Sequence, residues 1–209
     1  MTINLTVEQL QSATGMSIAA AEQWLQPLSQ AMEAYGIWSP LRMGAFLAQC
    51  AHETTSFTQL TENLNYSAGG LMKMWKKRFP TVEIAARYAH NPEKLANFVY
   101  PSRYGNGDRE SGDGWTFRGR GPLMLTFKDN YREASLDLFK TEWLLQVPDH
   151  VALSMQCGEA VAARYWYTRK CNDLADRRDF VGITKAISGG ETNLDDRLAR
   201  TDTALEALA

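Results

Sequence analysis

Apolar residues in most of this 209-residue chain recur at helical spacing. Between residues 17 and 35 they follow a period of about 3.6, and Gly36 ends the pattern. The next segment, Leu41–Ala51, is apolar with few interruptions, as is typical of a helix in the middle of a core. The pattern therefore predicts helices over both segments, the second of them buried on all sides.

Side chains that cap helix N-termini precede several other apolar segments. Thr6 with Gln9 three residues later makes a capping box, and Ser39 precedes a proline at the first helical position. Further caps are expected at Ser67, Thr81, Asn91 and Asn193. Helices are also expected over residues 128–139, 155–168 and 179–187.

Glycine interrupts the helical pattern between residues 101 and 121. Six of the 15 glycines fall in this stretch, so we expect a loop with a short hairpin around residues 115–117. No repeat, low-complexity segment or linker divides the chain. The expected fold class is α+β, mainly α, in one domain of two lobes. Residues 1–53 and 122–209 form the large helical lobe, and residues 54–121 form the smaller insertion lobe.

The charge balance argues against several classes of protein. The chain carries 22 basic and 24 acidic residues, whereas binders of nucleic acid or of membrane surfaces usually carry a basic excess. An apolar run of 18 residues is absent, and the N-terminus does not resemble a signal peptide. Three cysteines without a short pairing motif indicate reduced thiols. We therefore expect no nucleic-acid partner and no stable membrane insertion.

Metal and nucleotide motifs are incomplete in this sequence. After His52-Glu53, a serine stands where the HExxH zinc motif has its second histidine, and the other histidines and cysteines lack ligand spacing. Gly105-Asn106-Gly107 lacks the third glycine of a dinucleotide site, and there is no GxxxxGK phosphate loop. The sequence implies no metal and no organic cofactor.

Two carboxylates are the strongest candidates for chemistry. Glu53 follows the apolar helix, and Glu62 lies nine residues on in a polar segment. Poor solvation at the edge of a core favours the protonated form of a carboxyl group, which suits a general acid, while a solvated carboxylate suits a general base. Such a pair is the minimum equipment of a glycosidase. From spacing alone, a helix-end carboxylate and a solvated loop residue remain the alternative.

Three motifs resemble those of glycoside hydrolase family 19 in its bacterial and phage branch. Residues 45–57, which include FLAQ and AHE, resemble the signature that holds the family's first carboxylate. Residues 62–68, ENLNYSA, resemble the segment with the second carboxylate, and residues 114–122, GWTFRGRGP, resemble a third stretch. The resemblance extends from about residue 16 to the C-terminal helix. It implies a lysozyme-like fold whose small lobe contains a β-hairpin, without a separate cell-wall-binding module.

The resemblance also implies roles for single residues. Glu53 matches the family's general acid, Glu62 its general base and Thr126 the hydroxyl that positions water. The matched substrate-binding positions are Tyr66, Asn130, Arg118 and Arg197. For Arg118 a structural role stays open, and His52 is expected to be a core histidine rather than a proton relay.

Expectations also concern positions near these residues. Arg120 is expected to pair with a buried carboxylate, and Trp115 and Phe117 either stack on sugars or belong to the core. Met124 and Ser188 stand where the family usually has Gln and Asn. Both departures touch sugar recognition and spare the two carboxylates.

The resemblance implies a phage-type endolysin that hydrolyses β-1,4 bonds of bacterial peptidoglycan and lyses the host cell. The expected mechanism is inverting, with the cleft between the two lobes. Such an enzyme is a monomer stored in the host bacterial cytoplasm, and it depends on a holin-type pore to reach the cell wall. A family 19 chitinase acting on chitin oligomers and an inactive carbohydrate-binding relative remain alternatives. Muramidase and glucosaminidase specificity both remain open.

Overall fold

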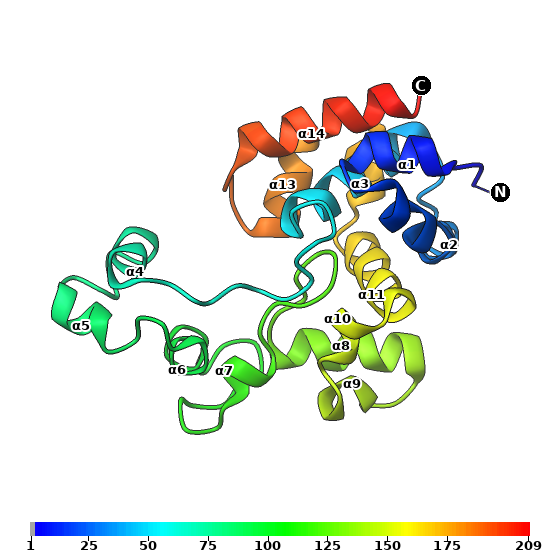
Figure 1. The fold of residues 1–209 in the computed structure, drawn as a ribbon. Helices are drawn as coiled ribbons and strands as arrows, with labels where there is room; N and C mark the ends of the chain where they lie inside the picture. The colour runs from blue at the N-terminus through cyan, green and yellow to red at the C-terminus, as the bar shows by residue number, and fades with distance from the viewer. Residues whose placement is uncertain (1–2) are drawn as a thin grey trace. The chain divides into compact units, whose positions relative to one another are not determined.

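A computed structural model describes residues 3–209, and the chain forms two units. Unit 1 comprises Met1–Thr61, Arg120–Leu125 and Asp149–Ala209, and unit 2 comprises Glu62–Gly119 and Thr126–Pro148. This division differs from the expected lobes: residues 54–61 and 120–121 group with unit 1, and residues 126–148 group with unit 2. Both units are built from helices (Figure 1).

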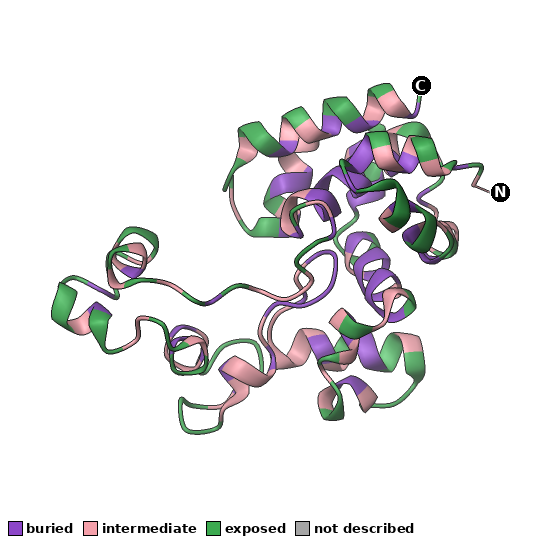
Figure 2. Cartoon of the chain, viewed as in Figure 1, coloured by how far each residue is buried: buried purple, intermediate pink, exposed green. Residues whose placement is uncertain are grey.

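Unit 1 is organised around one buried helix. Its helices are α1 (Val7–Thr14), α2 (Ile18–Ala34), α3 (Pro40–Glu53), α10 (His150–Leu153), α11 (Met155–Thr168), α12 (Cys171–Asp176), α13 (Phe180–Ser188) and α14 (Leu194–Ala207). Every residue of α3 from 43 to 51 is buried, as its continuous apolar run predicts (Figure 2). Helices α1, α12 and α14 all pack against it.

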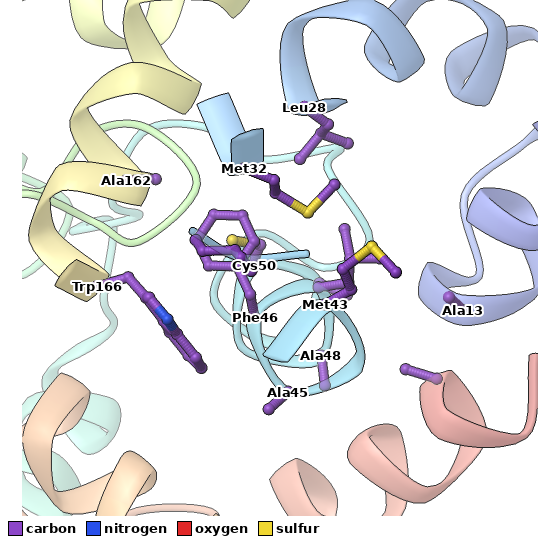
Figure 3. Close-up of a cluster of buried hydrophobic side chains, with 14 of the residues drawn as sticks. Ala13, Leu28, Met32, Met43, Ala45, Phe46, Ala48, Cys50, Ala162 and Trp166 are labelled. Carbon is purple, nitrogen blue, oxygen red and sulfur yellow. The ribbon is translucent and has the colours of Figure 1, made fainter. Parts of the chain in front are cut away.

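The core of unit 1 shows how closely its helices approach. The rings of Phe46 on α3 and Trp166 on α11 meet edge to face, with centroids 5.4 Å apart (Figure 3). A Cβ on Gly44 would lie 2.7 Å from the side chain of Leu205, so glycine is what allows α14 to lie against α3. This close packing places the N-terminal part of α14 against the C-terminal part of α3, where Glu53 lies.

Unit 2 has a smaller core of its own. Its helices are α4 (Ala68–Met74), α5 (Val82–Ala86), α6 (Pro92–Val99), α7 (Asp113–Thr116), α8 (Lys128–Phe139) and α9 (Trp143–Gln146). The core residues are Leu64, Leu71, Phe79, Ala85, Leu95, Ala96 and Val99. Phe79 is fully buried and contacts the rings of Trp75, Tyr88 and Phe98.

The mainly helical class is confirmed, but the expected hairpin is wrong. Residues 113–116 form helix α7, which packs against α6. Gly114 permits this contact, because a Cβ there would lie 2.6 Å from the carbonyl oxygen of Ala96. In the described part of the chain, the only β pairings are isolated bridges of Arg120 with Thr61 and with Leu125.

Most of the predicted helix starts are confirmed. Thr6 and Gln9 form the capping box, and Ser39, Ser67, Thr81 and Asn91 each accept a hydrogen bond from a first-turn N–H. Asn193 is the exception: it precedes α14 in a left-handed conformation, and its side chain does not cap the helix. Among residues 3–209, no helix combines the length and the apolar character needed to cross a membrane.

Candidate active site

Glu53 is the last residue of α3, and its carboxylate is held by a cation from another helix. Arg197 on α14 donates from Nη2 to Glu53 Oε1 at 2.6 Å. The Arg197 side chain is 3% exposed and that of Glu53 is 19% exposed, so the pair is largely shielded from water. Arg197 also donates to the side chain of Gln49 and, through Nε, to the carbonyl of Thr192 at 3.1 Å. These contacts fix the guanidinium, which in turn fixes the carboxylate.

His52 makes a second link between the same two helices. Its Nδ1 lies 2.6 Å from Oδ2 of Asp196, which also accepts from Arg200 Nε at 2.8 Å. The hydrogen bond from His52, together with that from Arg200, lowers the pKa of Asp196 below its ordinary value. His52 also lines an open depression of about 630 Å³ beside the start of α14. His52 thus pairs with Asp196, and the next residue, Glu53, pairs with Arg197.

Glu62, in unit 2, is positioned by two hydrogen-bond donors. The hydroxyl of Tyr100 donates to Oε1, and the backbone N–H of Gly119 donates to Oε2 at 3.2 Å. The backbone N–H of Glu62 donates to the Gly119 carbonyl at 2.9 Å. Burial raises the pKa of Tyr100 well above its ordinary value, and the charge of Glu62 raises it further. Tyr100 therefore stays protonated and remains a donor at neutral pH.

Thr126 lies beside the same glycine. A Cβ built on Gly119 would lie 3.3 Å from Thr126 Oγ1 and 3.4 Å from Glu62 Oε2. The hydroxyl and the carboxylate therefore approach one backbone position, as is needed to hold a water molecule jointly. Glu62 and Thr126 are 64 positions apart in sequence, and unit 2 brings them together.

The segment that carries Thr126 is held by two amide side chains. Asn130, in the first turn of α8, donates from Nδ2 to the Thr126 carbonyl at 2.6 Å. Asn106 accepts from the backbone N–H of Lys128 at 3.0 Å and donates to the Tyr100 carbonyl at 2.9 Å. Asn106 thus caps α8 and ties it to the residue that holds Glu62.

Tyr66 and Arg118 occupy different environments in unit 2. Tyr66 is half-buried against Trp75, and burial together with the charge of Glu62 raises its pKa. Arg118 lies over the ring of Trp115 at 3.7 Å from the centroid and donates to the Trp115 carbonyl at 2.9 Å. These contacts favour the structural role for Arg118. Tyr66, by contrast, lies close enough to Glu62 for that charge to raise its pKa.

Arg120 and the two aromatic residues near it are mostly structural. Arg120 is buried and pairs with Asp149, whose side chain is 64% exposed, so this partner is not the buried carboxylate that was expected. Phe117 is buried and packs against Tyr131, and Trp115 packs at the margin of the unit 2 core.

No family model matches the chain. A Haemophilus influenzae protein named "Glycosyl hydrolase family 19 domain-containing protein" is 39% identical over 174 residues, which cover 82% of each chain. The chain belongs to glycoside hydrolase family 19. The protein is therefore a glycosidase.

Solved family 19 structures share the fold of this glycosidase. One is described as a bacterial family 19 chitinase and another as chitinase C from Streptomyces griseus HUT6037. Each matches with a TM-score of 0.64 at 18% identity, over 98% of this chain and 94% of the other. The agreement covers both units of the family 19 fold.

The sequence did not single out four residues that this family 19 structure places around the carboxylates: Gln49, Tyr100, Asn106 and Gly119. Gln49 and Gly119 stand inside the matched motifs, so the motifs contained that signal. Asn106 was considered only as part of an incomplete nucleotide motif. Tyr100 gave no signal, because its partner is 38 positions away.

Met124 and Ser188, which depart from the family pattern, lie in a turn and at a helix end respectively. Met124 adopts a positive φ of 48° in the turn between Arg120 and Leu125. The Ser188 hydroxyl lies 2.9 Å from the Thr184 carbonyl and 2.8 Å from that of Gly190, at the end of α13. Within residues 3–209, no group of three or more histidine, cysteine, aspartate or glutamate residues could hold a metal ion.

Proposed function

We propose that this glycosidase hydrolyses β-1,4 bonds of bacterial peptidoglycan as a phage-type endolysin. The observation that carries the catalytic part is the arrangement in unit 2, where the Glu62 carboxylate and the Thr126 hydroxyl approach the same backbone position. A carboxylate and a hydroxyl that share one water molecule can orient it and take its proton. This is the equipment of a general base in an inverting glycosidase.

In the proposed reaction Glu53 donates its proton to the glycosidic oxygen as the bond to the anomeric carbon breaks. A water molecule held by Glu62 and Thr126 attacks that carbon from the opposite face and gives its proton to Glu62. Tyr100 and the Gly119 N–H hold the Glu62 carboxylate in one orientation. Arg197 holds the Glu53 side chain. Tyr66 and Asn130 contact the sugar. Arg118 contributes to substrate binding through its stacking on the Trp115 ring.

The endolysin assignment rests on sequence. The segment from Ala21 to Leu28 and the run Tyr35-Gly36-Ile37 resemble the phage branch of the family, in addition to the three motifs. An endolysin acts as a monomer that accumulates in the host bacterial cytoplasm. A holin-type pore then releases it to the cell wall, where hydrolysis lyses the host.

The reaction is tested with outer-membrane-permeabilised Gram-negative cells and with purified peptidoglycan. The wild-type protein should clear the cells and release new reducing ends, and Glu53→Gln should abolish both. Glu22→Gln, the same change at an exposed position of α2, is the matched control and should retain activity. Clearing by Glu53→Gln, or fragments without new reducing ends, would overturn the proposal. Mass spectrometry of the fragments separates muramidase from glucosaminidase.

The stereochemistry is tested on the same products. An inverting enzyme acting on a β-linkage releases the α-anomer first, which NMR detects before mutarotation. An initial β-product would contradict the assigned roles of Glu62 and Thr126.

A chitinase is the second candidate, because the two structural neighbours named above are both described as chitinases. Rapid hydrolysis of soluble chitin oligomers without release of fragments from peptidoglycan would favour it.

A further inference from the structure

We propose that exposed lysines on α4 and in the turn after it, together with an arginine at the C-terminal end of α5, bind the carboxylates of peptidoglycan stem peptides. This α4–α5 basic surface consists of Lys73, Lys76, Lys77 and Arg87. The inference rests on the proposed function, and it selects an anionic polysaccharide over neutral chitin.

The near-zero net charge of the chain conceals an uneven distribution of basic and acidic residues along the sequence. Residues 63–104 contain seven basic and two acidic residues, a net charge of +5. The other 167 residues contain 15 basic and 22 acidic residues, a net charge of −7. The positive charge therefore gathers on α4, α5, α6 and the segments that connect them.

The four residues of this basic surface lack ion-pair partners within the described part of the chain, in contrast to several arginines of unit 1. In unit 1 several arginines pair with carboxylates: Arg42 with Asp176, Arg120 with Asp149, Arg197 with Glu53 and Arg200 with Asp196. None of the four residues of the basic surface forms an ion pair with any residue between 3 and 209. All four are exposed. Their charge is thus available to an external anion.

The surface is built on an ordered frame. Helices α4 and α5 pack on the buried side chains of Leu71, Phe79 and Ala85. Arg78, between Lys77 and Phe79, donates from Nη1 to the carbonyl of Val99 at 2.6 Å. This bond ties the turn that carries Lys76 and Lys77 to the end of α6. The lysines therefore project from a backbone position that packing and hydrogen bonding hold.

Peptidoglycan is the occupant that fits both this surface and the proposed reaction. Its glycan backbone is related to chitin, but its stem peptides add carboxylates at regular intervals, while chitin is neutral. Four unpaired cations attract such a polymer at long range, and salt screens the attraction beyond about 8–10 Å at physiological ionic strength.

Binding is measured with the inactive Glu53→Gln protein, so that the polymer stays intact. The test variant adds Lys73→Gln, Lys76→Gln and Lys77→Gln to it. The matched control adds Lys170→Gln, Arg177→Gln and Arg178→Gln, which remove three exposed charges of unit 1. The probes are purified sacculi, sacculi whose carboxylates have been converted to methylamides, and colloidal chitin. Each is tested at low and at high salt.

The test variant should bind untreated sacculi about tenfold or more weakly than Glu53→Gln at low salt, and the difference should vanish at high salt. The control variant should bind nearly as well as Glu53→Gln. Methylamidated sacculi and chitin should bind all three proteins equally weakly. In an otherwise active background, the lysine substitutions should leave hydrolysis of a neutral soluble oligosaccharide unchanged, which shows that the fold is intact.

Equal binding of sacculi by test variant and Glu53→Gln would overturn the inference, as would an equal loss in the control variant. Tighter binding of phosphatidylglycerol vesicles or of a DNA duplex than of sacculi would identify a different anionic partner and overturn it too. Failure of the proposed function looks different: the wild-type protein would release no reducing ends, while the inactive protein could still bind sacculi through these lysines.

Discussion

Arg197 Nη2 donates a hydrogen bond to Glu53 Oε1 at 2.6 Å, across 144 positions of the chain. The contact joins the first turn of α14 to the last residue of α3. Arg197 is itself held by Gln49 and by the Thr192 carbonyl, so its guanidinium has little freedom to leave. The proposed general acid is thus positioned by a buried cation whose own contacts are satisfied.

Replacement of Arg197 by Gln should lower both activity and stability. The variant loses a hydrogen bond to a charged, partly buried carboxylate, which typically costs about 1.5–3 kcal/mol of unfolding free energy. Misplacement of Glu53 should lower turnover by about 100-fold. Arg197→Lys should restore neither activity nor stability fully, because an ammonium group cannot reach Gln49, Glu53 and Thr192 at once. Denaturant unfolding and initial rates of reducing-end release measure the two effects.

Arg200→Gln is the control, since it removes an exposed pair on the same helix and should change stability by less than about 1 kcal/mol. The double variant Glu53→Gln with Arg197→Gln should lose less stability than the two single losses added together. Simple additivity would show that the two side chains do not interact in solution.

Tyr100→Phe should slow catalysis while leaving the fold intact. The variant loses the hydroxyl that donates to Glu62 Oε1, a hydrogen bond to a charged group worth about 1.5–3 kcal/mol. We expect turnover to fall about tenfold or more, with little change in KM. The lost hydrogen bond stabilised the ionised carboxylate, so the acidic limb of the pH–rate profile should move to higher pH.

Tyr104→Phe removes a hydroxyl from an exposed ring of the same unit and should leave the profile unchanged. An unshifted acidic limb in Tyr100→Phe would mean that Tyr100 does not act on the titrating base.

Gly119→Ala should disturb the proposed water site directly. The new Cβ would lie 3.2 Å from Glu62 Cβ and 3.3 Å from Thr126 Oγ1, so these side chains must move by a few tenths of an ångström. Because catalysis depends on such positions, we expect turnover to fall about tenfold or more, with only a small loss of stability. Gly69→Ala is the matched control, because a Cβ there meets nothing within 4 Å. Equal activity of the two variants would show that Glu62 and Thr126 do not share a water molecule.

The sequence predicted the elements whose causes are local. Apolar periodicity and N-caps located α2, α3 and α6, because a cap and its helix lie within a few residues of each other. The hairpin was wrong because glycine density indicates only that a segment is not a long helix. Gly114 is small so that α7 can pack against the Ala96 carbonyl, a contact between residues 18 positions apart. Sequence patterns within a few residues of Gly114 do not predict that contact.

The candidate site shows the same limit. The motifs located Glu53, Glu62 and Thr126, because each stands in a recognisable run of residues. They did not indicate that Tyr100 holds Glu62 or that Asn106 caps α8. Both contacts depend on how unit 2 folds back on itself, and a tyrosine or asparagine in a loop has many ordinary roles.

Glu159 on α11 is a buried carboxyl group with no hydrogen-bond partner for either oxygen within residues 3–209. Burial raises its pKa well above its ordinary value, because a charged carboxylate is poorly solvated there. The thiol of Cys50 on α3 also has a raised pKa, mainly from burial and next from the charge of Glu159. Both groups are buried in unit 1.

The buried carboxyl group of Glu159 should make the protein less stable as pH rises. The folded state keeps the Glu159 proton at pH values where the unfolded chain, with an ordinary pKa of 4.5, has released it. Unfolding then releases a proton, so the unfolding free energy falls above about pH 4.5 by up to about 1.4 kcal/mol per pH unit. Glu159→Gln lacks this titration, and its stability relative to wild type should increase between pH 5 and pH 8. Glu22→Gln, at an exposed position, should follow the wild-type curve, and parallel curves for Glu159→Gln and wild type would refute the assignment.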